Sequence, residues 1–116
     1  MGRLTTHVLD TAAGKPAAGM RIELFLLDGG AVYLKTIHSN ADGRADGPLL
    51  EGVAFVHGHY ELRFHAGDYF RKSGVSLPEP AFLDIIPIRF GIANASQHYH
   101  VPLLVSPYGY STYRGS

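Results

Sequence analysis

The chain ends in His98-Tyr-His-Val-Pro-Leu-Leu-Val-Ser-Pro-Tyr-Gly-Tyr-Ser-Thr-Tyr-Arg-Gly-Ser116. Residues 98–105 alternate like a β-strand, a turn follows around Pro107, and residues 110–114 return as a second strand. Most domains end in polar residues that trail into solvent. This end is instead rich in tyrosine and carries Arg114, so we expect it to be docked and used. The alternative is a plain edge hairpin whose tyrosines fill a half-buried face.

Upstream of this hairpin, the chain contains further short stretches typical of strands, separated by turn signals. They lie at residues 4–11, 20–27, 31–38, 53–56, 59–65 and 82–92. Pro87 cannot donate a ladder hydrogen bond, which indicates an edge strand or a bulge at 82–92. Residues 66–73 are the one helical stretch, with Asp68 as the expected N-terminal cap and Gly74 as the stop. Short strands at regular spacing with one short helix predict an all-β sandwich.

Length and composition set the class of protein. The 116 residues predict one domain, residues 1–116, with 46% hydrophobic and 17% charged side chains. Ten basic and ten acidic side chains cancel, so we expect no nucleic-acid partner and no binding to an anionic membrane. The absence of cysteine excludes disulfides and thiolate chemistry and is consistent with a reducing compartment.

The beginning of the chain, Met-Gly-Arg-Leu-Thr-Thr-His, reads as a strand. It has no basic segment followed by an apolar one, so we expect no secretory signal. No apolar run is long enough to cross a bilayer. We therefore expect a cytoplasmic protein without a membrane partner.

Seven histidines are the compositional oddity of the chain. His57 and His59, and likewise His98 and His100, have the spacing that places two side chains on one face of a strand. Such a pair could bind zinc if a third ligand, for example His7, lay on a neighbouring strand. A hydrolytic site without metal is the other interpretation, in which a histidine near its ordinary pKa accepts a proton from water and an arginine stabilises an oxyanion.

Other kinds of site have weaker support. The loop at residues 40–48 has acidic residues at Asp42 and Asp46 but lacks the closing glutamate of a calcium loop. No Gly-x-Ser-x-Gly elbow and no phosphate-binding glycine loop is present. We predict a site that needs no metal and no cofactor.

Three segments carry a family resemblance. Leu4-Thr-Thr-His-Val-Leu-Asp-Thr11, followed by Gly-Lys-Pro-Ala, resembles the first strand of the transthyretin fold. The ending Tyr113-Arg-Gly-Ser116 resembles the terminal tetrapeptide of the transthyretin-related proteins, the 5-hydroxyisourate hydrolases of purine degradation. The loop Asn40-Ala-Asp-Gly-Arg44 and the segment His98–Leu104 extend the resemblance over essentially the whole chain.

The resemblance implies a transthyretin-like sandwich of two four-stranded sheets with one short helix. It also implies a homotetramer, a dimer of dimers that pair edge to edge and enclose a central channel lined by the C-terminal hairpin. Because the hormone-carrying transthyretins share the fold, a carrier of a small aromatic ligand is the alternative function. Those transthyretins lack the terminal tetrapeptide and the paired histidines.

Matched motif by motif, the resemblance implies catalytic residues His7, Arg44 and His100. It implies substrate binding by the terminal tetrapeptide, and His98 is an additional candidate because it shares a face with His100. These substrate-binding residues are Tyr113, Arg114, Gly115, Ser116 and His98. The implied reaction is hydrolysis of 5-hydroxyisourate to 2-oxo-4-hydroxy-4-carboxy-5-ureidoimidazoline in urate degradation. The histidines would activate water and Arg44 would stabilise the developing negative charge.

Overall fold

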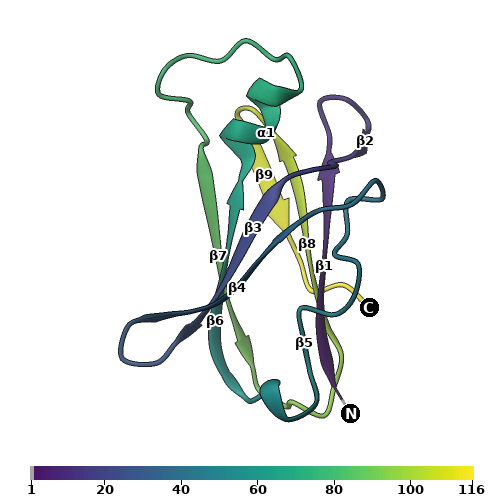
Figure 1. Ribbon diagram of the computed structural model, residues 1–116, viewed down its shortest axis with the longest axis vertical. Coiled ribbons are helices and arrows are strands. Elements are labelled where there is room, and N and C mark those ends of the chain that lie inside the picture. The colour runs from purple at the N-terminus through teal and green to yellow at the C-terminus, as the bar shows by residue number, and fades with distance from the viewer. Residues whose placement is uncertain (1) are drawn as a thin grey trace.

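The computed structural model describes residues 2–116 (Figure 1). Strands form most of the regular structure, and one α-helix and one 3-10 helix complete it. In chain order the elements are β1 (Arg3–Asp10), β2 (Lys15–Pro16), β3 (Arg21–Leu27), β4 (Ala31–His38), β5 (Leu50–Glu51), η1 (Gly52–Ala54), β6 (Gly58–His65), α1 (Ala66–Lys72), β7 (Ile85–Ile92), β8 (Tyr99–Ser106) and β9 (Gly109–Thr112).

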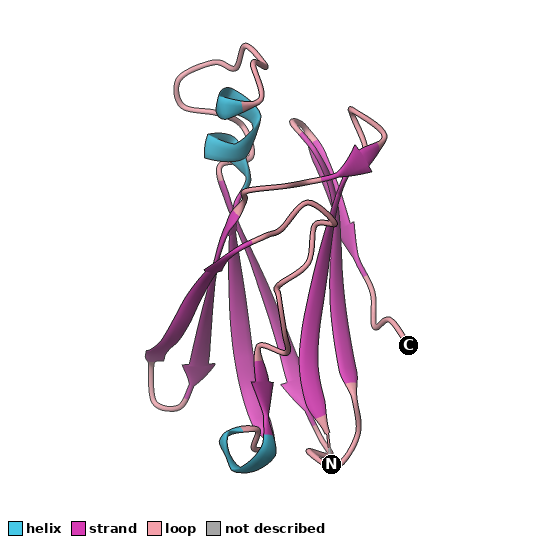
Figure 2. Cartoon of the chain, turned by 45° about the vertical axis from the view of Figure 1, so that its right-hand side comes forward, coloured by secondary structure: helices cyan, strands magenta, loops and turns pink. Residues whose placement is uncertain are grey.

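Two sheets pack face to face as two layers (Figure 2). The first sheet has the order β2-β1-β8-β9, and the second has the order β4-β3-β6-β7. The predicted sandwich is confirmed. The first sheet has five strands instead of four, because the short strands β2 and β5 both pair with β1. Strands β1 and β8 run parallel, and this pairing joins the two ends of the chain.

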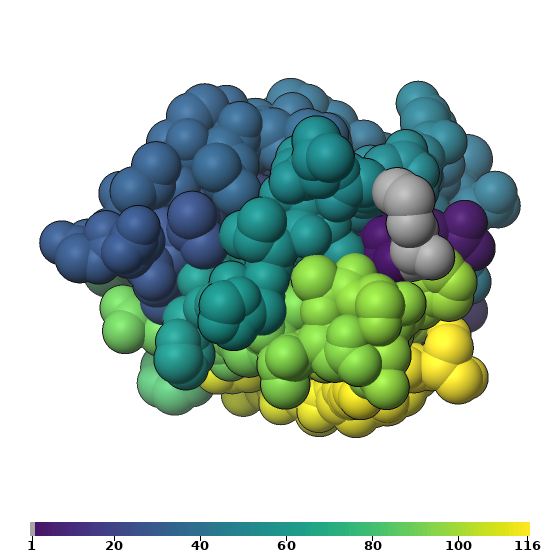
Figure 3. Space-filling model, turned by 90° about the horizontal axis from the view of Figure 1, so that it is seen from below, coloured from purple at the N-terminus to yellow at the C-terminus, as the bar shows by residue number. Residues whose placement is uncertain are grey.

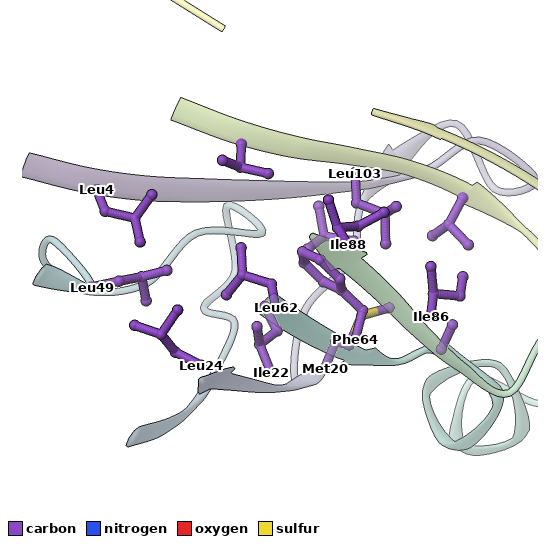
Figure 4. Packing of buried hydrophobic residues seen from close by; sticks show 14 of the residues in the cluster. Leu4, Met20, Ile22, Leu24, Leu49, Leu62, Phe64, Ile86, Ile88 and Leu103 are labelled. Atoms are coloured by element: carbon purple, nitrogen blue, oxygen red, sulfur yellow. The ribbon is translucent and has the colours of Figure 1, made fainter. Parts of the chain in front are cut away.

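The core fills the space between the two sheets (Figure 4). Alternation along β1 turns Leu4 and Val8 inward, where both are fully buried. Leu62 and Phe64 of β6 meet them from the second sheet. Full burial of such side chains contributes about 1.5–3 kcal/mol each. The same alternation leaves the odd-numbered positions of β1 on the outer face of the first sheet.

Two expected strands differ from the structure. Residues 53–56 form no strand, so that prediction is wrong. Gly52 has a positive φ of 63° and turns the chain into η1, which leaves Val53 99% exposed with no sheet to pack on. The expected strand at 82–92 begins only at Ile85. Its predicted edge position is confirmed, since β7 is the last strand of the second sheet and contains Pro87.

The predicted helix is confirmed as α1, although its cap is not. His65 occupies the N-cap without a side-chain hydrogen bond, and Asp68 lies in the first turn. The helix is held by burial of Tyr69 and Phe70 and by the Tyr69 hydroxyl, which donates to Asp10 Oδ2 at 2.8 Å. Within residues 2–116, no helix has the length and apolar character needed to cross a membrane.

The C-terminal residues form β9 at the edge of the first sheet and a tail that continues beside β8. Seen from below, they lie on the side of the molecule opposite the β3–β4 hairpin (Figure 3). The tail beyond β9 returns toward the middle of the β1–β8 pair (Figure 1). The end of the chain is therefore docked on the sheet, as the sequence predicts.

Candidate active site

The parallel pairing of β1 with β8 gathers chemically active side chains on one outer face. Thr5 lies opposite His100 in the register, and His7 lies opposite Pro102. All three polar side chains belong to the outward set of their strands and are half-buried. The ring centroids of His7 and His100 are 6.5 Å apart. The structure thus brings together two of the predicted catalytic residues.

Arg44 reaches the same face from a tight loop. Its backbone forms an isolated antiparallel bridge with His7. Asn40 shapes the loop, because its Oδ1 accepts hydrogen bonds from the backbone N–H of Asp42 at 2.9 Å and of Arg44 at 3.1 Å. The third predicted catalytic residue therefore joins the two histidines.

Glycine is required at position 43 for this approach. Gly43 has a φ of 76°, and a Cβ there would lie 2.4 Å from the carbonyl oxygen of Val8. The Val8 N–H donates to the Gly43 carbonyl at 2.8 Å. The Asp-Gly-Arg sequence thus lets the loop pack directly on β1 and places Arg44 beside His7.

The end of the chain closes the other side of the site. Gly115 bridges to His100, and its N–H donates to the His100 carbonyl at 2.8 Å. A Cβ at Gly115 would lie 2.4 Å from His100 Cδ2, so the backbone packs against the imidazole ring. Any larger residue would displace either the tail or the ring.

Arg44, His100 and the end of the chain lie on a pocket of about 590 Å³, and His7 lies beside Arg44 and His100. The pocket includes both His98 and His100, as their spacing predicts, and also the terminal Ser116. Most of its lining residues carry cationic, imidazole or hydroxyl side chains. The lining residues are Arg3, Thr5, Thr6, Arg44, Ala45, Gly47, His98, His100 and Ser116.

Sequence reasoning missed Arg3 and Thr5 as members of this pocket. The signal that could have found them is the alternation of β1, since both residues share the outward parity of His7. Sequence alone does not show that β8 lies beside β1, so Thr5 gave no sign of facing His100.

Tyr113 and Arg114 lie on a second, more apolar cleft of about 250 Å³ between β7 and the C-terminal strands. The Arg114 guanidinium sits over the Tyr99 ring, 4.1 Å from its centroid. Its Nη2 donates to the His98 carbonyl at 3.1 Å and to Gln97 Oε1 at 3.4 Å. The terminal tetrapeptide is therefore divided, with Gly115 and Ser116 turned to the histidine site and the two preceding residues turned away from it.

The electrostatics of the site favour neutral histidines. Burial is the main cause that lowers the pKa of His7 below 6.5, and the charge of Arg44 lowers it further. A hydrogen bond to the Asp42 backbone and the Asp42 charge partly oppose this shift. Burial, Arg44 and His7 together lower the pKa of His100. Both imidazoles are thus available as proton acceptors at neutral pH.

The described part of the chain contains no group of three or more His, Asp or Glu side chains able to hold a metal ion. His57 and His59 line other clefts, near β7 and the β3–β4 hairpin, away from His7. In the loop suggested for calcium, Asn40 is committed to backbone N–H groups and donates from Nδ2 to Asp46. The geometry gives neither the zinc nor the calcium interpretation a ligand set.

The fold and this face define a class of protein: a transthyretin-like sandwich with a pocket of histidine and arginine on its outer face. The model of the HIUase/Transthyretin family matches residues 4–115, and the chain belongs to this family. It is 68% identical over 116 residues to 5-hydroxyisourate hydrolase 2 of Rhizobium meliloti (strain 1021), a match that covers 99% of this chain and 97% of that protein.

Solved structures agree with this placement. (S)-allantoin synthase is 50% identical with a TM-score of 0.94, over 99% of this chain and 44% of that longer chain. Klebsiella pneumoniae 5-hydroxyisourate hydrolase is 32% identical with a TM-score of 0.80, over 100% of this chain and 94% of that one. Sea bream transthyretin in complex with thyroxine is 26% identical with a TM-score of 0.87, over 97% of this chain and 94% of that one.

Proposed function

We propose that this chain is a hydrolase that converts 5-hydroxyisourate to 2-oxo-4-hydroxy-4-carboxy-5-ureidoimidazoline in urate degradation. The observation that carries the proposal is that Arg44, His100 and the chain end line one pocket while His7 lies beside Arg44 and His100. The names of its close relatives support the choice of substrate.

In the proposed reaction, a histidine accepts a proton from water and the resulting hydroxide adds to a ring carbonyl carbon of the substrate. Negative charge develops on the carbonyl oxygen, and the permanently charged Arg44 stabilises it. The carbon–nitrogen bond of the cyclic amide then breaks. The leaving nitrogen takes its proton from the imidazole that was protonated in the first step, so both histidines return to their starting states. The lowered pKa values of His7 and His100 keep the accepting imidazole neutral before each turnover.

The chain end has two roles in this proposal. Ser116 lines the pocket and Gly115 packs next to it on His100, and we expect both to contact the substrate ring. His98 lies on the rim of the same pocket and is a further substrate contact. Substrate binding by Tyr113 and Arg114 stays a prediction, because in this chain the Arg114 guanidinium stacks on Tyr99.

We extend the proposal to a homotetramer made of two edge-paired dimers around a channel. Supporting it, β7 and β9 end their sheets with unpaired edges within the described chain. Exposed edges are normally covered or paired in natural proteins. Large apolar side chains near these edges are also exposed, among them Phe82 at 71% and Tyr108 at 64%. Light scattering coupled to size exclusion tests this assembly, and a monomeric mass would contradict it.

A carrier of a small aromatic ligand fits this site poorly. The histidine pocket contains two arginines, Arg3 and Arg44, together with His98 and His100. An aromatic hormone gains affinity mainly from apolar walls, whereas this lining suits a small polar heterocycle. The expected cytoplasmic location belongs to the proposal as well, and fractionation of cells that express the chain would test it.

The deciding assay generates 5-hydroxyisourate in the cuvette from urate and urate oxidase and follows its ultraviolet decay with and without the protein. We expect decay well above the spontaneous rate, and we expect His7→Ala to abolish the acceleration. Decay at the spontaneous rate with the intact protein would overturn the proposed function while leaving the fold unaffected.

A further inference from the structure

The imidazole of His100 is held by a neighbour that the proposed mechanism leaves without a role. Thr5 faces His100 across the parallel β1–β8 pair, and its Oγ1 lies 2.8 Å from His100 Nδ1. Both residues are half-buried on the outer face of the first sheet. A threonine hydroxyl can donate one hydrogen bond and accept others, so this contact is able to fix both the orientation and the tautomer of the ring.

The rest of the ring is restricted from the opposite edge. Gly115 packs on the Cγ–Cδ2 side so closely that an added Cβ would lie 2.4 Å from Cδ2 and 3.1 Å from Cγ. With Nδ1 bonded to Thr5 and Cδ2 covered by the chain end, Nε2 is the nitrogen left for the pocket. A ring flip that exchanged Nδ1 with Cδ2 would lose the bond to Thr5.

We propose that Thr5 is a positioning residue of the reaction, which holds His100 with Nε2 toward the substrate as a single tautomer. This inference rests on the proposed function for its catalytic consequence. Within residues 2–116, the ring nitrogen of His100 is the one side-chain partner that the Thr5 hydroxyl has. Donation into the Nδ1 lone pair satisfies that hydroxyl, and it leaves the proton of the neutral ring on Nε2.

This arrangement gives the two histidines different roles in the reaction. An Nε2–H on His100 donates a hydrogen bond to the carbonyl oxygen on which negative charge develops, while His7 accepts the proton of the attacking water. The protonated His7 then gives this proton to the leaving ring nitrogen, so both imidazoles are neutral again before the next turnover. Thr5 touches neither proton and acts through the orientation of His100.

The test uses Thr5→Val, which keeps the β-branched shape and removes the hydroxyl, with Thr5→Ser as the variant that restores it. Loss of one neutral hydrogen bond that orients a catalytic group corresponds to roughly a five- to tenfold fall in kcat. We expect that fall in Thr5→Val with KM within about twofold, and kcat within about twofold of wild type in Thr5→Ser. Thr11→Val is the matched control, since Thr11 follows the end of β1 and its hydroxyl donates to the Val105 carbonyl of β8 at 3.1 Å, away from the site.

Nitrogen-15 NMR of the imidazoles provides the readout that a purely structural role would not change, with His100 assigned by its loss in His100→Gln. We expect the Nε2–H tautomer in the wild type and a mixture of tautomers in Thr5→Val. An unchanged kcat in Thr5→Val, or the same tautomer balance in both proteins, would overturn the inference. The spectra need no substrate, so they test Thr5 even if the wild type fails to hydrolyse 5-hydroxyisourate, an outcome that would overturn the proposed function instead.

Discussion

The two outer faces of the sandwich carry the same types of residue in opposite electrostatic settings. On the second sheet, Glu61 lies between Arg63 at 2.5 Å and Arg89 at 2.7 Å, and Glu23 meets His65 at 2.5 Å. On the first sheet, His7, His100 and Arg44 have no carboxylate within ion-pair distance in the described chain.

The pKa shifts follow this difference. On the second sheet, the His65 hydrogen bond lowers the pKa of Glu23, and burial raises that of Glu61 less than Arg63 and Arg89 lower it. Those carboxylates stay charged and paired. On the first sheet, burial and an unpaired arginine push the histidines toward their neutral forms. Clustered histidine and arginine side chains without carboxylate partners therefore indicate a functional site. The same side chains paired with carboxylates indicate a structural network.

Removal of Arg44 should have the largest effect. Arg44→Ala removes the stabilisation of the developing oxyanion, which is typically worth about 2.7–4 kcal/mol in the barrier. We expect kcat to fall about a hundredfold or more with an unchanged melting temperature, measured with the 5-hydroxyisourate decay assay. Arg21→Ala is the matched control on the other face, where Arg21 pairs with Glu23, and it should retain full turnover. Near wild-type activity in Arg44→Ala would remove Arg44 from the mechanism.

The second prediction concerns the outer face of the second sheet, where the carboxylates are paired with cationic side chains. Glu61 is 3% exposed and accepts from two arginines, so Glu61→Gln weakens two charged hydrogen bonds and leaves two cations without a counter-charge. We expect the free energy of unfolding in urea to fall by about 1–3 kcal/mol. Turnover per folded molecule should not change.

Glu51→Gln serves as its control, because Glu51 is exposed and such surface changes stay within about 0.5 kcal/mol. A stable Glu61→Gln with reduced turnover would reverse the roles of the two faces.

Part of the histidine-bearing face could be predicted from the sequence. Alternation on β1 and β8 located the inward and outward residues, and the Asp-Gly-Arg loop and terminal tetrapeptide identified the residues that meet at His7 and His100. Of the residues that the family resemblance implies, Arg44, His100 and Ser116 share one pocket, whereas Tyr113 and Arg114 lie on another cleft. Thr5 was not anticipated, because its partner is fixed by the β1–β8 register.

The sequence patterns gave no indication of the ion pairs on the outer face of the second sheet. Glu23, Glu61, Arg63, His65 and Arg89 belong to three strands, and their pairing depends on how β3, β6 and β7 lie side by side. The strand expected at 53–56 failed for a related reason. Its apolar residues satisfied the local pattern, but Gly52 turns the chain into η1, which exposes Val53 while Phe55 packs into the core. Local patterns specify the face of a strand and do not specify its neighbour.

The third prediction concerns Arg114, whose guanidinium lies on the second cleft and not in the histidine pocket. The Arg114 guanidinium stacks on the Tyr99 ring and donates hydrogen bonds to the His98 carbonyl and to Gln97 Oε1. These contacts hold the chain end in place. A cation–π contact and a hydrogen bond are each worth about 1 kcal/mol, so Arg114→Ala should lower kcat/KM by roughly tenfold. Arg114→Lys should keep part of the activity, since it retains the charge without the planar fork.

A double-mutant cycle separates this role from direct substrate binding. If Arg114 acts through the tail, deletion of residues 115–116 should remove the same activity with or without Arg114→Ala, and the two losses should not add. Additive losses would mean that Arg114 contacts the substrate independently, as the family resemblance implies.

The smallest expected effect is a pH dependence of stability that differs between the faces. The folded pKa values of His7 and His100 lie below 6.5, so in that window the unfolded chain binds more protons than the folded one. Stability should therefore fall as the pH drops below about 6.5, and it should fall again below about 4.5 as Glu23 and Glu61 become protonated. Melting temperatures between pH 8 and pH 3 would show both steps, with the upper one no more than about a few degrees. Combining His7→Gln with His100→Gln should remove the upper step and leave the lower one. An upper step that persists in this variant would assign it to other histidines and break the contrast between the two faces.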